Sequence, residues 1–239
     1  MLADLLYALW PYQIFKSVFF RGGVAFLTTH AVIVALMPAL IRYFRSSGIT
    51  SDFKRPEPGL KPYAGGKPIM GGGLLIVAVL VSIVLWMELN QFIIALLLIM
   101  VAFGVIGALD DLQKVLHRRR VERGEAEKKD YSDKADGIPG TVRLGLEFLV
   151  AAVVVIGLYR FVEIDGHLVV PMIPLKWWYP YLPRYLFVPF MIVIIVAGAN
   201  AVNLTDGMDS LATVPILTCT LFVASVAYVG SDPELYQRL

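Results

Sequence analysis

Six long apolar stretches constrain the fold of this chain more than any other feature of its sequence. They cover residues 24–44, 71–87, 92–109, 144–159, 185–202 and 210–229. A helix needs about 20 apolar residues to cross the hydrocarbon core of a bilayer, and backbone groups in lipid must bond internally. Hydrophobic residues make up 58% of the 239 residues and charged residues 17%, which is more apolar surface than a soluble domain can bury. We therefore predict an all-α polytopic membrane protein with six transmembrane helices.

The distribution of lysine and arginine predicts the side of the membrane on which each loop lies. Segments 42–69 and 112–143 hold six and nine of these residues, against six on the opposite side. Because cytoplasmic loops carry an excess of positive charge, both segments are predicted to be cytoplasmic and both termini to be outside. A net charge of +2 gives no indication of a nucleic-acid partner. Residues 1–239 are predicted to form a single membrane domain with cytoplasmic loops at 45–70, 110–143 and 203–209.

Three smaller features complete the predicted organisation. Residues Leu5–Phe20 are rich in aromatic side chains, are interrupted by Pro11 and lack the basic start of a signal peptide, so we expect an interfacial segment before the first span. Asp165-Gly166 lies between apolar-rich flanks, which predicts a small outer β-hairpin. The single cysteine, Cys219, excludes an intrachain disulfide and is interpreted as a packing residue.

The first polar cluster is Asp110-Asp111, at the cytoplasmic end of the third predicted span, with Lys114 following. Adjacent carboxylates at a membrane boundary repel each other and lose hydration, which a lysine or a divalent cation can offset. Mg²⁺ is typically held by one or two carboxylates together with substrate phosphates. The alternative is an ordinary helix end with solvated acids.

The second cluster lies in the sequence NAVNLTDGMD, between the fifth and sixth predicted spans. Asn203, Asp206 and Asp209 are spaced by three, so they share one face if the region is helical. This inside turn contains acids and neither lysine nor arginine, which favours a cation site. The alternative is a polar turn in which Asp209 caps the next helix.

The third cluster is the glycine-rich segment 65–73, GGKPIMGGG, which contains Lys67 and leads into the second predicted span. Accessible backbone amides and a helix N-terminus favour anions, although the spacing is not that of a Walker A motif. Small residues for close helix packing explain the segment equally well. Taken together, the three clusters indicate an enzyme that joins a water-soluble phosphorylated substrate to a lipid phosphate with the help of Mg²⁺.

These motifs resemble those of a known family. NAVNLTDGMDSLA is closely similar to the NAVNLTDGLDGLA signature of the bacterial phospho-N-acetylmuramoyl-pentapeptide transferases. GVIGALDDLQKV and KPIMGG resemble that family's GxxDDxxKV and TPTMGG segments, and the resemblance covers essentially the whole chain. It implies transfer of phospho-MurNAc-pentapeptide from its UDP carrier to undecaprenyl phosphate, forming lipid I and UMP with Mg²⁺. It also implies a role in peptidoglycan synthesis at the bacterial inner membrane, with a cytoplasmic active face.

The resemblance also implies roles for individual residues. Asp110, Asp111 and Asp206 would be the catalytic carboxylates and the Mg²⁺ ligands. It also places a set of residues at the substrates: Lys67, Lys114, Arg143, Asn203, Gly207, Met208 and Asp209. Within this set, Lys114 and Asn203 would contact phosphate and residues 207–209 would lie near the uridine. A homodimer is compatible with the resemblance.

The chain departs from the family pattern in several places. Ala64 stands where the family has a lysine, Lys67 and Ile69 replace two threonines, and Ser210 replaces a glycine. Lys67 could supply the charge that Ala64 lacks. The family has ten spans, with a further aspartate and a histidine-rich loop beyond the sixth. We therefore expect this sequence to be an N-terminal portion or a shortened member.

Three alternatives remain open at this point. One is a related enzyme that transfers a HexNAc phosphate from a UDP-sugar to a polyprenyl phosphate for another surface polymer. Another is a non-catalytic relative that binds substrate or a partner without turnover. A transporter, prompted by Glu147 within a span, is less favoured because Glu147 can pair with Arg143 one helical turn away.

Overall fold

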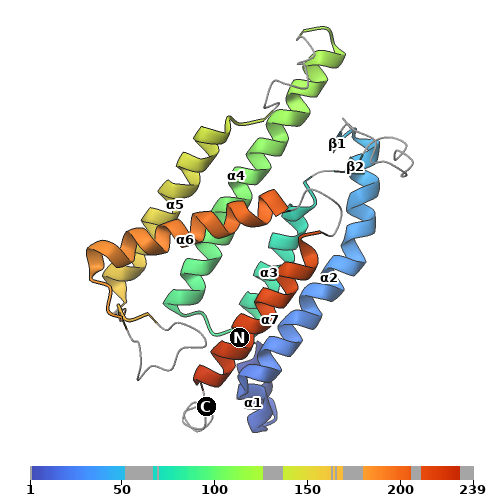
Figure 1. Cartoon of the computed structure of the whole chain (residues 1–239). Coiled ribbons are helices and arrows are strands. Elements are labelled where there is room, and N and C mark those ends of the chain that lie inside the picture. Colours follow the sequence, from blue (N-terminus) through green and yellow to red (C-terminus); the bar gives the residue numbers. More distant parts are fainter. Residues whose placement is uncertain are drawn as a thin grey trace. The chain divides into compact units, whose positions relative to one another are not determined.

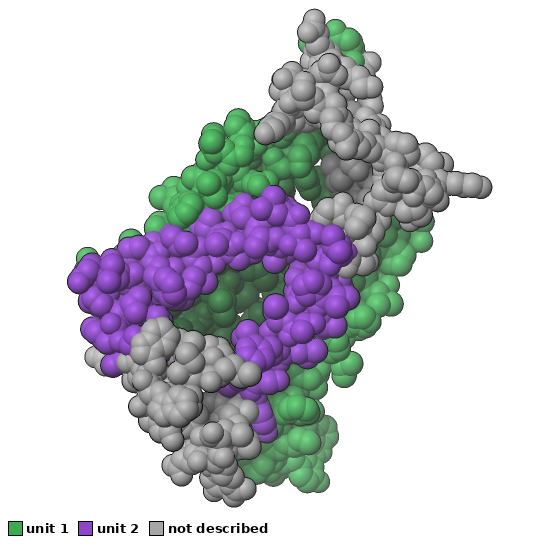
Figure 2. All heavy atoms as spheres, in the orientation of Figure 1, with its two compact units in different colours: residues 1–165 green, residues 166–239 purple. Residues whose placement is uncertain are grey.

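In the residues that it describes, the computed structural model is all-α apart from one short strand pair and one isolated β-bridge (Figure 1). It describes residues 2–51, 67–68, 70–125, 137–162, 164, 166–168, 180–205 and 211–231. Contacts divide the chain into two compact units, Met1–Asp165 and Gly166–Leu239, which are coloured separately in Figure 2 and are described here one at a time.

The first unit holds most of the helices. Its elements are α1 (Leu2–Leu9), the 3-10 helix η1 (Gln13–Lys16), α2 (Val18–Ser46), α3 (Gly72–Trp86), α4 (Gln91–Glu122) and α5 (Gly140–Phe161). The second unit contributes α6 (Arg184–Thr205) and α7 (Thr213–Ser231). The predicted all-α class is therefore confirmed, and the break between α1 and η1 falls at the position of Pro11.

Four of the helices are long and apolar enough to cross a membrane. They are Val18–Ser46, Gln91–Val121, Gly140–Phe161 and Arg184–Thr205, which correspond to four of the six predicted spans. The other two predicted spans contain shorter apolar helices, Gly72–Trp86 and Thr213–Tyr228. At 1.5 Å per residue, the 15 residues of α3 extend about 22 Å, less than the roughly 30 Å of a hydrocarbon core. The chain is a multi-pass membrane protein.

Helices α3 and α4 follow each other along the chain and form a helical hairpin. The side chain of Asn90 begins α4, because its Oδ1 accepts a hydrogen bond from the Ile93 amide at 2.9 Å. Further along, Gly104 of α4 faces the side chain of Ile76, and a Cβ at position 104 would collide with that side chain. The missing side chain at Gly104 therefore allows α3 and α4 to approach closely.

Polar side chains join α2 to α3 within their apolar surfaces. Thr29 Oγ1 donates to Ser82 Oγ at 2.7 Å, and Trp86 Nε1 donates to Thr28 Oγ1 at 2.9 Å. Ser82 is fully buried, and it also donates to the carbonyl of Ala78 at 2.8 Å. Because each buried hydroxyl has a partner, these groups cost little in an apolar setting and fix how the two helices face each other.

A buried arginine connects four segments at the N-terminal end of α2. Arg21 Nη2 donates to Asp4 Oδ1 of α1 at 2.8 Å, Nη1 donates to Glu88 before α4, and Nε donates to the Phe15 carbonyl of η1 at 3.1 Å. We call Arg21, Asp4 and Glu88 the arginine clamp. The clamp ties the predicted interfacial segment to the first long helix.

The predicted outer β-hairpin about Asp165-Gly166 is not found among the residues that the structure describes. Residues 166–168 pair instead with the chain just before α6: Leu182 N donates to the Gly166 carbonyl and Leu168 N to the Pro180 carbonyl, both at 2.9 Å. His167 and Tyr181 form the resulting antiparallel bridge. The prediction considered only the turn dipeptide and its immediate neighbours. The backbone groups of Gly166 and Leu168 pair instead with residues 180–182, farther along the chain. Residues 163, 165 and 169–179 lie outside the described part.

A short strand pair that the sequence did not predict lies within the basic segment 45–70. Strand β1 (Thr50–Ser51) pairs antiparallel with β2 (Lys67–Pro68), with Thr50 opposite Pro68 and Ser51 opposite Lys67. This pairing places the backbone of Lys67 a few residues beyond the C-terminal end of α2.

Candidate functional site

Helix α4 positions the first predicted polar cluster. It does not end near Leu109, as the predicted span does, but continues without a break to Glu122. Residues 110–122, which lie in the segment predicted as a cytoplasmic loop, are therefore helical, and the side of the membrane on which they lie stays a prediction. Leucine, glutamine, lysine and arginine in this stretch are good helix formers. Asp110 and Lys114, four residues apart, consequently lie on the same helix face.

The two carboxylates share one lysine. Lys114 Nζ lies 2.6 Å from Asp110 Oδ2 and 3.3 Å from Asp111 Oδ1. Asp110 is buried, with 9% of its surface exposed, whereas Asp111 and Lys114 are more accessible. We call Asp110, Asp111 and Lys114 the carboxylate cluster. Of the two partners that the sequence allows for the paired acids, a lysine or a divalent cation, the structure shows the lysine.

The segment just before α5 covers one side of Asp110. The amide of Ile138 donates a hydrogen bond to Asp110 Oδ1 at 2.8 Å. Gly137 lies against the same carboxylate: a Cβ there would collide with Oδ1, and it would come within 2.9 Å of Asp110 Cγ and 3.1 Å of Lys114 Cε. Each oxygen of Asp110 therefore has a partner, the lysine for one and a backbone amide for the other. Gly137 and Ile138 belong to none of the motifs that predicted the site from the sequence.

Arg143 and Glu147 form the ion pair that their spacing predicts. Arg143 Nε lies 3.6 Å from Glu147 Oε1 on α5, and Glu147 is buried. The pairing gives Glu147 a structural explanation and weakens the transporter alternative. The role of Arg143 toward a substrate stays a prediction.

The remaining predicted site residues are described only in part. Asn203 is exposed in the last turn of α6, in the second unit. Lys67 is placed through its backbone in β2. Asp206, Gly207, Met208 and Asp209 lie outside the described residues, so the predicted set of Asp110, Asp111 and Asp206 is not tested. Among the described residues, no three histidine, cysteine or acidic side chains gather as a metal site.

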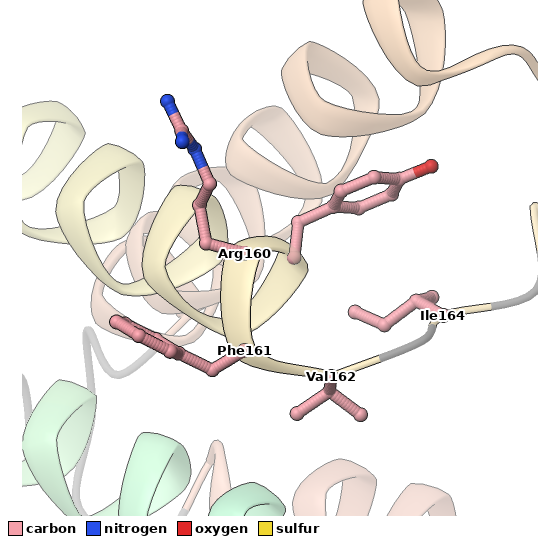
Figure 3. Close-up of a pocket in the computed structure, with 5 residues that line it drawn as sticks. Arg160, Phe161, Val162 and Ile164 are labelled. Carbon is pink, nitrogen blue, oxygen red and sulfur yellow. The ribbon is translucent and has the colours of Figure 1, made fainter.

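A hollow at the far end of α5 offers a second place to look for a site. Its lining residues are Tyr159, Arg160, Phe161, Val162 and Ile164. In Figure 3 the Arg160 side chain points away from Val162 and Ile164, so the polar and apolar groups do not converge. The hollow lies at the C-terminal end of α5, whereas Asp110 contacts the residues just before its N-terminal end. The carboxylate cluster is the stronger candidate.

A second contact stabilises the polar extension of α4. Arg119 Nη2 donates to the Ser47 carbonyl at the end of α2 at 3.2 Å. The extension is thus held at Asp110 by residues before α5 and at Arg119 by the end of α2. The carboxylate cluster sits on a helix that is fixed on both sides.

The fold and the cluster define a class: a multi-pass membrane protein with paired carboxylates on a helix that continues beyond its apolar part. The model of the Glycosyl transferase family 4 matches residues 92–238, which is more than half of the chain. The chain belongs to this family. The match includes every predicted site residue except Lys67.

Two curated relatives refine the comparison. The phospho-N-acetylmuramoyl-pentapeptide-transferase of Koribacter versatilis (strain Ellin345) is 32% identical over 246 residues, covering 95% of this chain and 59% of that protein. The protein of the same name from Thermodesulfovibrio yellowstonii is 32% identical over 236 residues, covering 96% of this chain and 61% of that protein. The chain thus spans about 60% of the length of the curated relatives it matches.

Proposed function

We propose that the complete protein transfers phospho-MurNAc-pentapeptide from UDP-MurNAc-pentapeptide to undecaprenyl phosphate. The products are lipid I and UMP, and the reaction takes place at the cytoplasmic face of the bacterial inner membrane during peptidoglycan synthesis. The observation that carries the proposal is the 32% identity, over about 95% of this chain, to two proteins named for that transfer. The carboxylate cluster on a membrane helix supports it with suitable chemistry.

The reaction is a phosphoryl transfer between two anions. An oxygen of undecaprenyl phosphate attacks the phosphorus that bears the sugar, an oxygen–phosphorus bond forms, and the pyrophosphate bond breaks. UMP leaves with the electron pair of that bond. A phosphomonoester has a second pKa near 6, so the lipid phosphate is largely dianionic at neutral pH and needs little help from a base. The protein must mainly hold the two phosphates together against their repulsion.

Lys114 is the residue best placed to bind a phosphate. Its side chain is 45% exposed, so the ammonium can turn from the carboxylates toward a phosphate oxygen. Asn203 is proposed as a second phosphate contact and Arg143 and Lys67 as further basic contacts. Gly207, Met208 and Asp209 are proposed to lie near the uridine.

The donor set at the cluster suits Mg²⁺. Asp110 and Asp111 provide hard carboxylate oxygens, and with a single lysine beside them the cluster keeps a net negative charge. We propose these two residues and Asp206 as its ligands. A bound Mg²⁺ supplies charge neutralisation at the pyrophosphate and at the transferring group.

UMP release by the complete protein in native membranes tests this function. We expect release from UDP-MurNAc-pentapeptide plus undecaprenyl phosphate, and much less from UDP-GlcNAc. Asp206→Asn should abolish it, whereas Glu125→Gln, which alters an exposed acid beyond α4, should not. Release from UDP-GlcNAc alone would favour the HexNAc-phosphate transferase. Binding of either donor without UMP release would favour a non-catalytic relative, and release that is unchanged by Asp206→Asn would refute the role of Asp206.

A further inference from the structure

We propose that Gly137 and the backbone amide of Ile138 are positioning groups for Asp110, which set the direction of its carboxylate for a divalent cation. The inference rests on the proposed function only in giving Asp110 a task in phosphoryl transfer. Neither residue belongs to the three polar motifs of the sequence. Both act through Asp110 and need not touch a substrate.

The hydrogen bond from Ile138 fixes one oxygen of the carboxylate. The Ile138 amide lies 2.8 Å from Asp110 Oδ1, while Lys114 Nζ lies 2.6 Å from Oδ2. A backbone amide cannot rotate away as a side chain can, so Oδ1 stays in place when Lys114 moves. The oxygen left to change partners is Oδ2, which shares Lys114 Nζ with Oδ1 of the more exposed Asp111.

Gly137 provides the space that this hydrogen bond requires. A Cβ at position 137 would overlap Asp110 Oδ1 and would reach 2.9 Å from Asp110 Cγ, closer than real Cβ atoms approach other atoms. The third neighbour, Lys114 Cε at 3.1 Å, is the far part of a flexible side chain and can yield. The carboxylate cannot yield without losing its bond to the Ile138 amide. Alanine at position 137 should therefore turn the carboxylate of Asp110.

The backbone of Gly137 does not itself require glycine. The described glycines with positive φ are Gly48 and Gly124, and Gly137 is not among them. An alanine can adopt its backbone conformation, so the effect of a substitution there reports on the space beside Asp110 and not on backbone strain. This separation makes Gly137 a direct probe of how Asp110 is held.

Groups that orient a metal ligand typically change metal affinity by about 10–100-fold when they are altered. We expect Gly137→Ala to weaken Mn²⁺ binding to the purified complete protein by about 10-fold, measured by electron paramagnetic resonance. Mn²⁺ serves here as the spectroscopic probe for the hard-cation site. Gly140→Ala is the matched control, because its added Cβ meets nothing within 4 Å and it lies only three residues away. We expect wild-type affinity for that variant.

A double-variant cycle keeps the test valid if Gly137→Ala impairs folding. In an Asp110→Ala background the carboxylate that the new Cβ would strike is gone, so adding Gly137→Ala should change neither Mn²⁺ affinity nor melting temperature. Additive losses would overturn the proposal, and so would equal affinity in Gly137→Ala and wild type. A wild-type protein that does not bind Mn²⁺ would also overturn the proposal.

The same samples separate this inference from the proposed function. UMP release by the wild type, together with unchanged Mn²⁺ binding in Gly137→Ala, would leave the transferase standing and remove the positioning role. Conversely, Gly137→Ala could bind Mn²⁺ more weakly than a wild type that releases no UMP from either sugar nucleotide. That result would support the positioning role and refute the transferase.

Discussion

The arginine clamp and the carboxylate cluster each combine one cation with two carboxylates, but they bury opposite partners. In the clamp the Arg21 side chain is 7% exposed, while Asp4 and Glu88 are 47% and 72% exposed. In the cluster the Asp110 and Asp111 side chains are 12% and 30% exposed, and it is Lys114 that is accessible at 45%. Both sets belong to the first unit of the chain.

This difference separates a structural ion pair from a site that can exchange its cation. A buried arginine has five donors in a rigid fork, and three of its nitrogens bond to three different segments. Removing the guanidinium unties those segments. A half-exposed lysine is a point charge on a flexible stem, so a divalent cation or a phosphate can compete with its contacts. The comparison predicts that changes at the clamp affect stability and that changes at the cluster affect turnover.

The largest effect is expected from Asp110→Asn in the complete protein. Asparagine keeps the shape and an oxygen that can accept from the Ile138 amide, but it removes the charge. We expect UMP release to fall by about 100-fold or more, the scale for losing one preorganised electrostatic group, with an unchanged melting temperature. A variant that retains most of its turnover would remove Asp110 from the catalytic machinery.

A smaller effect, of the opposite kind, is expected from Arg21→Met. Methionine retains apolar bulk but loses the hydrogen bonds to charged groups, each worth about 1.5–3 kcal/mol when buried. Because Asp4 and Glu88 are exposed and can rehydrate, we expect a total loss of only about 1–3 kcal/mol. Thermal unfolding in detergent should show a lower melting temperature. The turnover per folded molecule should stay within about twofold of wild type, which corresponds to less than about 0.5 kcal/mol.

Glu88→Gln gives the graded control for the clamp. It removes one exposed carboxylate and leaves Arg21 paired with Asp4 and with the Phe15 carbonyl. The expected loss is below about 1 kcal/mol, as for other exposed ion pairs. A loss of stability as large as that of Arg21→Met would mean that the ion pair with Glu88 accounts for most of the stability that the clamp contributes.

The smallest effect distinguishes the lysine of the cluster from the arginine of the clamp. Lys114→Gln removes the cation that competes for the two carboxylates, so Mn²⁺ should bind about 2–5-fold more tightly, which corresponds to an exposed ion pair of 0.5–1 kcal/mol. UMP release should fall at the same time if Lys114 binds phosphate. Weaker Mn²⁺ binding would show that Lys114 organises the carboxylates and does not compete for them.

Local patterns predicted most of the helices and part of the site. Apolar stretches were enough to locate the helices, because their length and composition alone make them helical in lipid. The ion pairs Asp110–Lys114 and Arg143–Glu147 were also predictable, because a spacing of four residues brings side chains together on any helix.

Contacts between distant segments were not predictable in this way. Arg21 finds partners 17 and 67 residues away, and the Ile138 amide reaches Asp110 from 28 residues away. The outer β-hairpin was predicted from one turn dipeptide and took no account of a competing pairing with residues 180–182. The predicted span ended near Leu109 because the apolar residues end there, although the leucine, glutamine, lysine and arginine that follow are good helix formers and continue α4 to Glu122.

The unbroken course of α4 has a consequence for how this chain can change. Its 32 residues extend about 48 Å, and one continuous helix carries both the long apolar stretch and Asp110. One residue added anywhere between Gly104 and Asp110 would turn the carboxylates by about 100° relative to Ile76 and advance them by about 1.5 Å. Such an insertion would leave a perfectly good helix whose acids face away from Ile138. The five residues between Gly104 and Asp110 therefore fix the direction in which the carboxylates point around the helix axis, as well as their distance along it.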